Sequence, residues 1–112
     1  MILASKPHGW MPTPAQVAAL EAGLPDAMRT RAPEFRRPLS GYFRQYVGTI
    51  EDGKRWIEVH GASIEDVASL VAEGLDPRQE ELRVFDGGDS YFEARYDPAT
   101  GAFDGAGPHG EA

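Results

Sequence analysis

The stretch YFRQYVGTIEDGKRWIEVH, residues 42–60, decides the fold, because it reads as two β-strands joined by a tight turn. Aromatic and β-branched residues fill both arms, and neither arm contains a proline. Between the arms lies Glu51-Asp52-Gly53, and an Asp-Gly pair tolerates the positive φ values of a two-residue hairpin turn. Alternate residues of the second arm should face the core. The others, Trp56, Glu58 and His60, should lie on the opposite face.

Helical patterns flank this hairpin on both sides. Thr13 begins a capping-box pattern, and apolar residues at helical spacing predict a helix over 14–31. Pro25 predicts a kink or break in that helix, because its ring clashes with the carbonyl four residues back. Ser63 is a good N-cap for a second helix, which Gly74 should end.

The second half of the chain continues with strands and turns. Residues 82–85 and 91–96 read as strands joined by a turn at Gly87-Gly88, and Phe103 should begin a short fifth strand. Hairpins rather than alternating helices connect the strands, so the sheet should be largely antiparallel. The sequence therefore predicts a single two-layer α+β domain with four or five antiparallel strands and helices packed on one face.

The expected domain organisation is simple, because 112 residues suit one compact core. Residues 1–12 read as an N-terminal arm anchored by Trp10, and 13–104 as the α+β domain. Glycines crowd the end of the chain, so 105–112 should be a flexible tail.

Several strand and turn segments resemble those of a known group of proteins. The segments are Trp10-Met11-Pro12-Thr13, Tyr42-Phe43-Arg44-Gln45-Tyr46-Val47-Gly48, Asp86-Gly87-Gly88, Tyr91-Phe92 and Tyr96-Asp97-Pro98. They resemble small uncharacterised bacterial proteins, many of them envelope lipoproteins. The resemblance implies an envelope location and no particular activity. The chain departs from the lipoprotein pattern after Leu3-Ala4-Ser5, where Lys6 replaces the lipidated cysteine.

The order of elements also resembles the cystatin fold, in which a helix precedes antiparallel strands. Cystatins carry a Gln-x-Val-x-Gly segment on an inhibitory hairpin, and Gln45-Tyr46-Val47-Gly48 is one residue shorter. The resemblance implies a cystatin-like outline, whereas protease inhibition does not follow from it.

Composition and charge exclude several classes of function. The absence of cysteine excludes disulfide frameworks, thiolate nucleophiles and iron–sulfur clusters. A net charge of −7 disfavours nucleic acid as a partner. The first 56 residues carry an excess of three positive charges, and the remaining residues an excess of ten negative charges. The acidic half could steer a basic partner, or it could be a solvated acidic surface.

The location of the protein stays open at this stage. No apolar run is long enough to span a bilayer, so we expect no transmembrane segment. The first five residues lack the pattern of a signal peptide. The periplasm or envelope follows if a signal was removed, and the cytoplasm otherwise. The sequence gives no oligomeric state.

Two sets of residues are candidates for a site. His60 ends a strand with Glu58 two residues away on the same face, so the two could form an acid–base pair. The alternative is a histidine bonded to nearby backbone. Strand alternation cannot bury both aromatic rows of residues 42–47, so we expect Tyr42, Tyr46 and Trp56 to form an exposed binding surface.

The acidic turns and the remaining motifs suggest no cofactor. Asp86, Asp89, Asp97 and Asp104 gather at glycine-rich turns, but turn hydrogen bonding accounts for them as well as calcium does. The sequence therefore predicts no catalytic residues, no metal ligands and no cofactor, and leaves calcium binding open. The favoured hypothesis is a non-catalytic protein-binding or inhibitory module. The alternative is a small α+β enzyme that uses His60 and a carboxylate.

Overall fold

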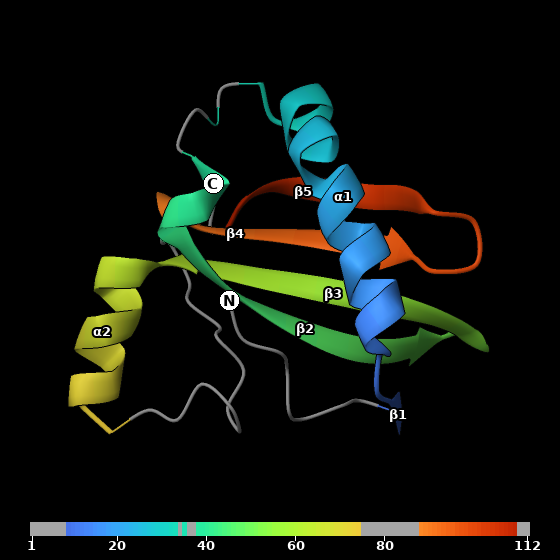
Figure 1. Cartoon of the computed structure of the whole chain (residues 1–112), viewed down its shortest axis with the longest axis horizontal. Helices are drawn as coiled ribbons and strands as arrows, with labels where there is room; N and C mark the ends of the chain where they lie inside the picture. Colours follow the sequence, from blue (N-terminus) through green and yellow to red (C-terminus); the bar gives the residue numbers. More distant parts are fainter. Residues whose placement is uncertain (1–8, 34, 36–37, 75–87, 110–112) are drawn as a thin grey trace.

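The computed structural model describes residues 9–33, 35, 38–74 and 88–109, which form one sheet and two helices (Figure 1). In chain order the elements are β1 (Gly9–Trp10), α1 (Pro14–Arg31), the short 3₁₀ helix η1 (Leu39–Gly41), β2 (Tyr42–Glu51), β3 (Lys54–Ser63), α2 (Ile64–Ala72), β4 (Gly88–Asp97) and β5 (Ala102–His109). The strands lie side by side in sequence order, each antiparallel to the next. The expected single α+β domain with an antiparallel sheet is confirmed. Neither helix in these ranges is long and apolar enough to cross a membrane.

Helix α1 begins with the predicted capping box. The Gln16 backbone N–H donates to the Thr13 hydroxyl, and the Thr13 N–H donates to the Gln16 side-chain oxygen. The predicted break is wrong, because α1 runs through Pro25 without interruption. An interior proline costs a helix about 3 kcal/mol. Here Leu20 and Leu24 are fully buried against the sheet, and this packing holds the helix together.

The hairpin of β2 and β3 forms as the sequence predicts. Asp52 and Gly53 both have positive φ, 54° and 78°, as the two central residues of a type I′ turn require. All ten residues of β2 pair with β3, and this register places Tyr46 opposite Val59. The side chains of Val59 and Ile57 are completely buried, so their predicted direction is confirmed.

Helix α1 lies across one face of the sheet, and the main core fills the space between them (Figure 1). All four long strands contribute to this core, and α1 supplies the opposing layer. Its members include Leu20, Leu24 and Met28 from α1 and Tyr42, Tyr46, Ile57, Val59, Phe92, Ala94 and Tyr96 from the sheet.

A polar cluster within this layer joins α1 to β2. The Arg44 Nε donates to Glu21 Oε2 at 2.8 Å, and the Tyr46 hydroxyl donates to the same oxygen. Arg44 Nη1 also donates to the Leu39 carbonyl at 2.6 Å. Burial, followed by the hydrogen bond to Glu21, raises the pKa of Tyr46, so its hydroxyl stays protonated and continues to donate. Glu21 thus accepts two hydrogen bonds from one strand.

Helix α2 packs elsewhere, so the expectation that both helices share one face is wrong. Its Val67 and Leu70 pack with Phe43, Ala62 and Tyr91, which project from the face opposite α1. Two features explain this position: the direct continuation of β3 into α2, and the aromatic packing on the other face of the sheet. β3 continues directly into α2 at Ser63, so the helix must begin at the end of the sheet.

The other face at that end of the sheet is already filled. The ring of Phe35 lies 5.6 Å from that of Tyr42 and 5.9 Å from that of Phe92. This aromatic group leaves α2 only the opposite face at the same end.

The expected arm and tail also differ from the structure. Gly9 and Trp10 form β1, and the Trp10 indole N–H donates to the Thr49 carbonyl at 2.9 Å, so the anchor at Trp10 is confirmed. The predicted tail is wrong over residues 105–109, because β5 extends to His109. Hydrogen bonding along β4 holds this glycine-rich segment in place, although the segment itself has low strand propensity. The predicted strand at 82–85 and residues 110–112 lie outside the described residues.

The first prediction concerns Gly61, whose missing side chain leaves space for an aromatic ring. A Cβ at this position would overlap the Phe92 ring in the core, so Gly61→Ala should destabilise the protein by about 3 kcal/mol. Chemical denaturation measures the change. Gly41→Ala is the matched control, because a Cβ there meets nothing within 4 Å. Equal stability of the two variants would contradict the packing described here.

Candidate functional site

The face of the sheet opposite α1 carries a polar array built from two adjacent strands. β3 provides Glu58 and His60, and β4 provides Glu93 and Arg95. The register sets His60 directly opposite Glu93, and Glu58 directly opposite Arg95. Side chains directly opposite each other on one face have Cβ atoms about 5 Å apart. The four polar residues are therefore mutual neighbours.

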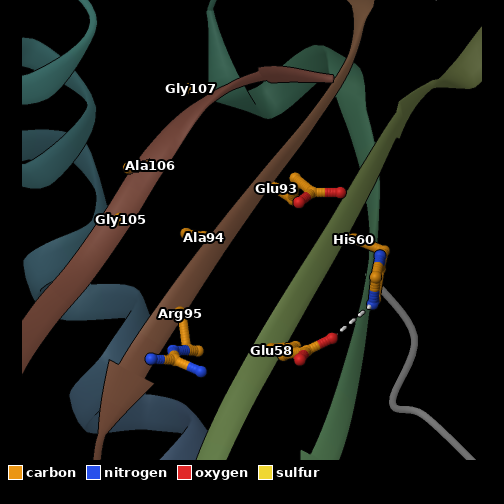
Figure 2. A pocket seen from close by; sticks show the side chains of 8 residues that line it. All are labelled: Glu58, His60, Glu93, Ala94, Arg95, Gly105, Ala106 and Gly107. Carbon is orange, nitrogen blue, oxygen red and sulfur yellow. Dashed lines mark ion pairs between the residues drawn. The ribbon is translucent and has the colours of Figure 1, made fainter. Parts of the chain in front are cut away.

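A hollow lies beside this array because β5 carries almost no side chains there. Gly105 is paired with Arg95, and Gly107 with Glu93, so the open face of β5 lacks side chains next to both. The resulting pocket has a volume of about 500 Å³ (Figure 2). This volume falls within the range of small-molecule sites.

His60 is the most buried ionisable group in the wall of this pocket, with 5% of its surface exposed. Its Nε2 lies 3.3 Å from Glu58 Oε1, yet this nitrogen forms no hydrogen bond. Figure 2 shows the Glu58 and Glu93 carboxylates on the same side of the sheet, both extended toward the imidazole. A buried polar atom without a hydrogen bond costs about 1–3 kcal/mol.

Arg95 closes one end of the pocket and is itself held by two carboxylates. Its Nη1 donates to Glu51 at 2.6 Å, and its Nη2 to Asp104 at 2.5 Å. The hydrogen bonds to Glu51 and then to Asp104 raise the pKa of Arg95. Its guanidinium also lies 4.0 Å from the ring centre of Trp56. The positive charge of Arg95 is therefore matched by acids that do not line the pocket.

The structure brings together only part of the predicted site. Glu58 and His60 lie in the pocket wall as neighbours, and Trp56 is half-buried further along the same face. The prediction of an exposed aromatic row is wrong. The side chains of Tyr42 and Tyr46 are only 4% and 1% exposed, and both belong to the main core. Pairing through the hairpin turn sets Tyr46 beside Val59, a residue already assigned to the core. The register of the hairpin would have identified the buried row.

Sequence reasoning missed Glu93 and Arg95, although a signal for them was present. Phe92, Ala94 and Tyr96 all face the core, so the two residues between them must face the other way. The missing information was that β4 pairs with β3 in a register that aligns Glu93 with His60.

The acidic turns have structural roles wherever the structure describes them. Asp97 accepts from the Ala99 N–H at 2.9 Å and pairs with Lys54 at 2.8 Å. Asp104 binds Arg95. Asp86 lies outside the described residues, as does the Asp89 side chain. Among the side chains that are described, no three His, Asp or Glu residues are grouped to hold a metal ion.

Comparison with known proteins finds no matching family model, no similar curated protein and no similar solved structure. The resemblances to the bacterial envelope group and to cystatins therefore stay predictions.

The second prediction separates the two aromatic residues that were expected to form one surface. Tyr46→Ala should destabilise the protein by about 4 kcal/mol, because it removes a buried ring from the core. Trp56→Ala should cost only about 1 kcal/mol, since Trp56 is half-buried and contacts the cations of Lys54 and Arg95. Urea denaturation of both variants tests the difference, and a larger loss for Trp56→Ala would reverse the assignment of the two faces.

The third prediction concerns acid stability at Asp97. The hydrogen bond from Lys54, supported by the Ala99 N–H and by Thr100, lowers the pKa of Asp97 to about 2. A carboxylate with a lowered folded pKa stabilises the protein fully above its unfolded pKa of about 4 and loses that contribution as pH falls toward 2. Asp97→Asn should therefore show a flatter decrease in stability between pH 5 and pH 2. Thermal denaturation across this range measures the decrease, and identical profiles for the two proteins would contradict the assignment.

Proposed function

We propose that this chain is a non-catalytic protein-binding or inhibitory module, and that its partner docks on the polar face of the sheet over the pocket of Glu58, His60, Glu93 and Arg95. The single observation behind this proposal is the buried His60 Nε2, which has no hydrogen bond although it lies in the wall of a pocket. A partner that binds there could form a hydrogen bond with Nε2 and so remove the free-energy penalty of a buried nitrogen without one.

The charge distribution supports a basic partner. Each of the described residues that line the pocket belongs to the acidic half of the chain, residues 57–112. A concentration of one sign of charge raises the rate at which oppositely charged proteins associate. Among the described basic residues of the first half, Arg29 and Arg31 lie at the end of α1 and Arg44 pairs with Glu21 of that helix, away from the pocket.

A small enzyme is the second candidate, and the pairing of His60 with Glu58 favours it. A carboxylate beside an imidazole is a common arrangement for general acid–base catalysis. However, the eight described residues that line the pocket offer only the carboxylates of Glu58 and Glu93 and the imidazole of His60 as reactive groups, because Arg95 is already bound by Glu51 and Asp104. Binding therefore accounts for more of the site than catalysis does.

The fourth prediction tests the binding function by comparing immobilised proteins. Wild-type chain, Glu93→Gln and Glu73→Gln are exposed to an extract of the organism that encodes the protein. Glu93 lies in the pocket wall, whereas Glu73 caps the distant end of α2, so the two variants remove the same charge at different places. A polypeptide retained by the wild type and Glu73→Gln, and lost with Glu93→Gln, is the expected result.

Raising the ionic strength should also slow association of the retained polypeptide, because salt screens the attraction between the acidic face and a basic partner. Equal retention by all three proteins, or no retention above a blank support, would contradict the proposed function.

A further inference from the structure

Glu58 and His60 bring a carboxylate oxygen and an imidazole nitrogen together in the pocket wall. The two residues are two positions apart on β3, so both side chains leave the strand on the same face. His60 Nε2 lies 3.3 Å from Glu58 Oε1, the contact that the dashed line marks in Figure 2. A charged hydrogen bond between such groups would measure about 2.7–2.9 Å. Nε2 forms no hydrogen bond, and with the ring proton on Nδ1 this nitrogen offers its lone pair to another group.

The separation of these two atoms matches the edge of a zinc coordination tetrahedron. Zinc–nitrogen and zinc–oxygen bonds of about 2.0–2.1 Å, at tetrahedral angles, place neighbouring ligand atoms about 3.3–3.4 Å apart. An imidazole nitrogen with a carboxylate oxygen is also a ligand pair that zinc accepts. Magnesium and calcium prefer oxygen ligands alone, so the nitrogen selects against them.

We propose that Glu58 Oε1 and His60 Nε2 are the two protein ligands of a zinc ion in the wall of the pocket. This inference goes beyond the proposed function and does not depend on it. The sequence predicted no metal ligands, because the separation of the two atoms is visible only in the folded strand.

The pocket has room for the ligands that these two residues do not supply. Within the part of the chain that the structure describes, no His, Asp or Glu completes a set of three. The pocket volume is about 500 Å³, whereas a water molecule occupies about 30 Å³. Gly105 and Gly107 also leave the β5 side of the pocket without side chains. The ion would therefore keep two positions for water or for an atom of another molecule, as open zinc sites do.

The groups around the pair are compatible with metal binding. Glu58 also takes part in another interaction. A carboxylate has two oxygens, and carboxylates that bind metals are ordinarily hydrogen-bonded as well, which orients them. Arg95 lies directly opposite Glu58, but its charge is balanced by the carboxylates of Glu51 and Asp104.

The fifth prediction uses zinc chloride and the ¹⁵N-labelled chain. Zn²⁺ should shift the ring nitrogen signals of His60 in a saturable way, with the larger change at Nε2, and EDTA should reverse the shift. Mg²⁺ at the same concentration should cause no saturable shift, because it prefers oxygen ligands in octahedral geometry. The chain has two other histidines, and their separate signals report any zinc that binds elsewhere.

Two variants in the same pocket separate ligation from a general effect of negative charge. Glu58→Gln should weaken zinc binding at least about tenfold, since loss of even an outer-shell partner of a metal ligand costs about 10–100-fold. Glu93→Gln removes the same charge directly opposite His60 on β4. It should weaken zinc binding only about threefold, the contribution of a screened charge on the next strand. Thermal denaturation checks that both variants are folded.

The wild-type chain alone provides an independent measurement. Zinc should raise its melting temperature and magnesium should not, because a ligand that binds the folded state stabilises that state. Zinc shifts confined to the other two histidines, an equal response to magnesium, or equal weakening by the two variants would overturn the inference. None of these measurements involves a partner protein, so their failure would leave the proposed function intact.

Discussion

The register of the β2–β3 hairpin is the constraint on which the rest of the structure depends. Because side chains alternate along a strand, a slip of one residue would move every side chain of β3 to the other face. The two positive φ values at Asp52 and Gly53 fix the loop at two residues and so fix the pairing. With that register, Ile57 and Val59 lie under α1, and Glu58 and His60 lie on the opposite face. The core and the pocket are therefore two consequences of one turn.

The attachment of α1 to this sheet combines apolar packing with one polar contact. Helix α1 buries an apolar stripe that includes Leu20 and Leu24, and Glu21 beside that stripe accepts hydrogen bonds from Arg44 and Tyr46. Arg44 is only 14% exposed, so loss of its carboxylate partner would leave a largely buried charge. A contact of this kind restricts how the helix can slide along the sheet, whereas apolar packing alone tolerates small shifts.

The pocket forms where β5 carries glycines in place of larger side chains and where β3 and β4 carry polar side chains on the same face. Gly105 and Gly107 leave β5 bare next to Glu93 and Arg95, and without them larger side chains would fill the space. Low strand propensity is the cost of these glycines, and the pairing with β4 compensates for it. Glycines with this spacing on a paired strand are consistent with a surface shaped for a ligand. The buried His60, without a hydrogen bond at Nε2, points to the same conclusion from a different observation.

The sequence by itself determined the local structure. The capping box at Thr13, the N-cap at Ser63, the Asp52-Gly53 turn and the alternation along β3 depend on residues close together in the chain, so they could be predicted correctly. The tertiary structure decided what depends on distant residues. Burial of Leu24 against the sheet allows α1 to continue through Pro25. Helix α2 packs on the face opposite α1, and residues 105–109 belong to the sheet because they pair with β4. The tertiary structure also buried Tyr42 and Tyr46 and set Glu93 beside His60, because the faces of separate strands are related only through their pairing.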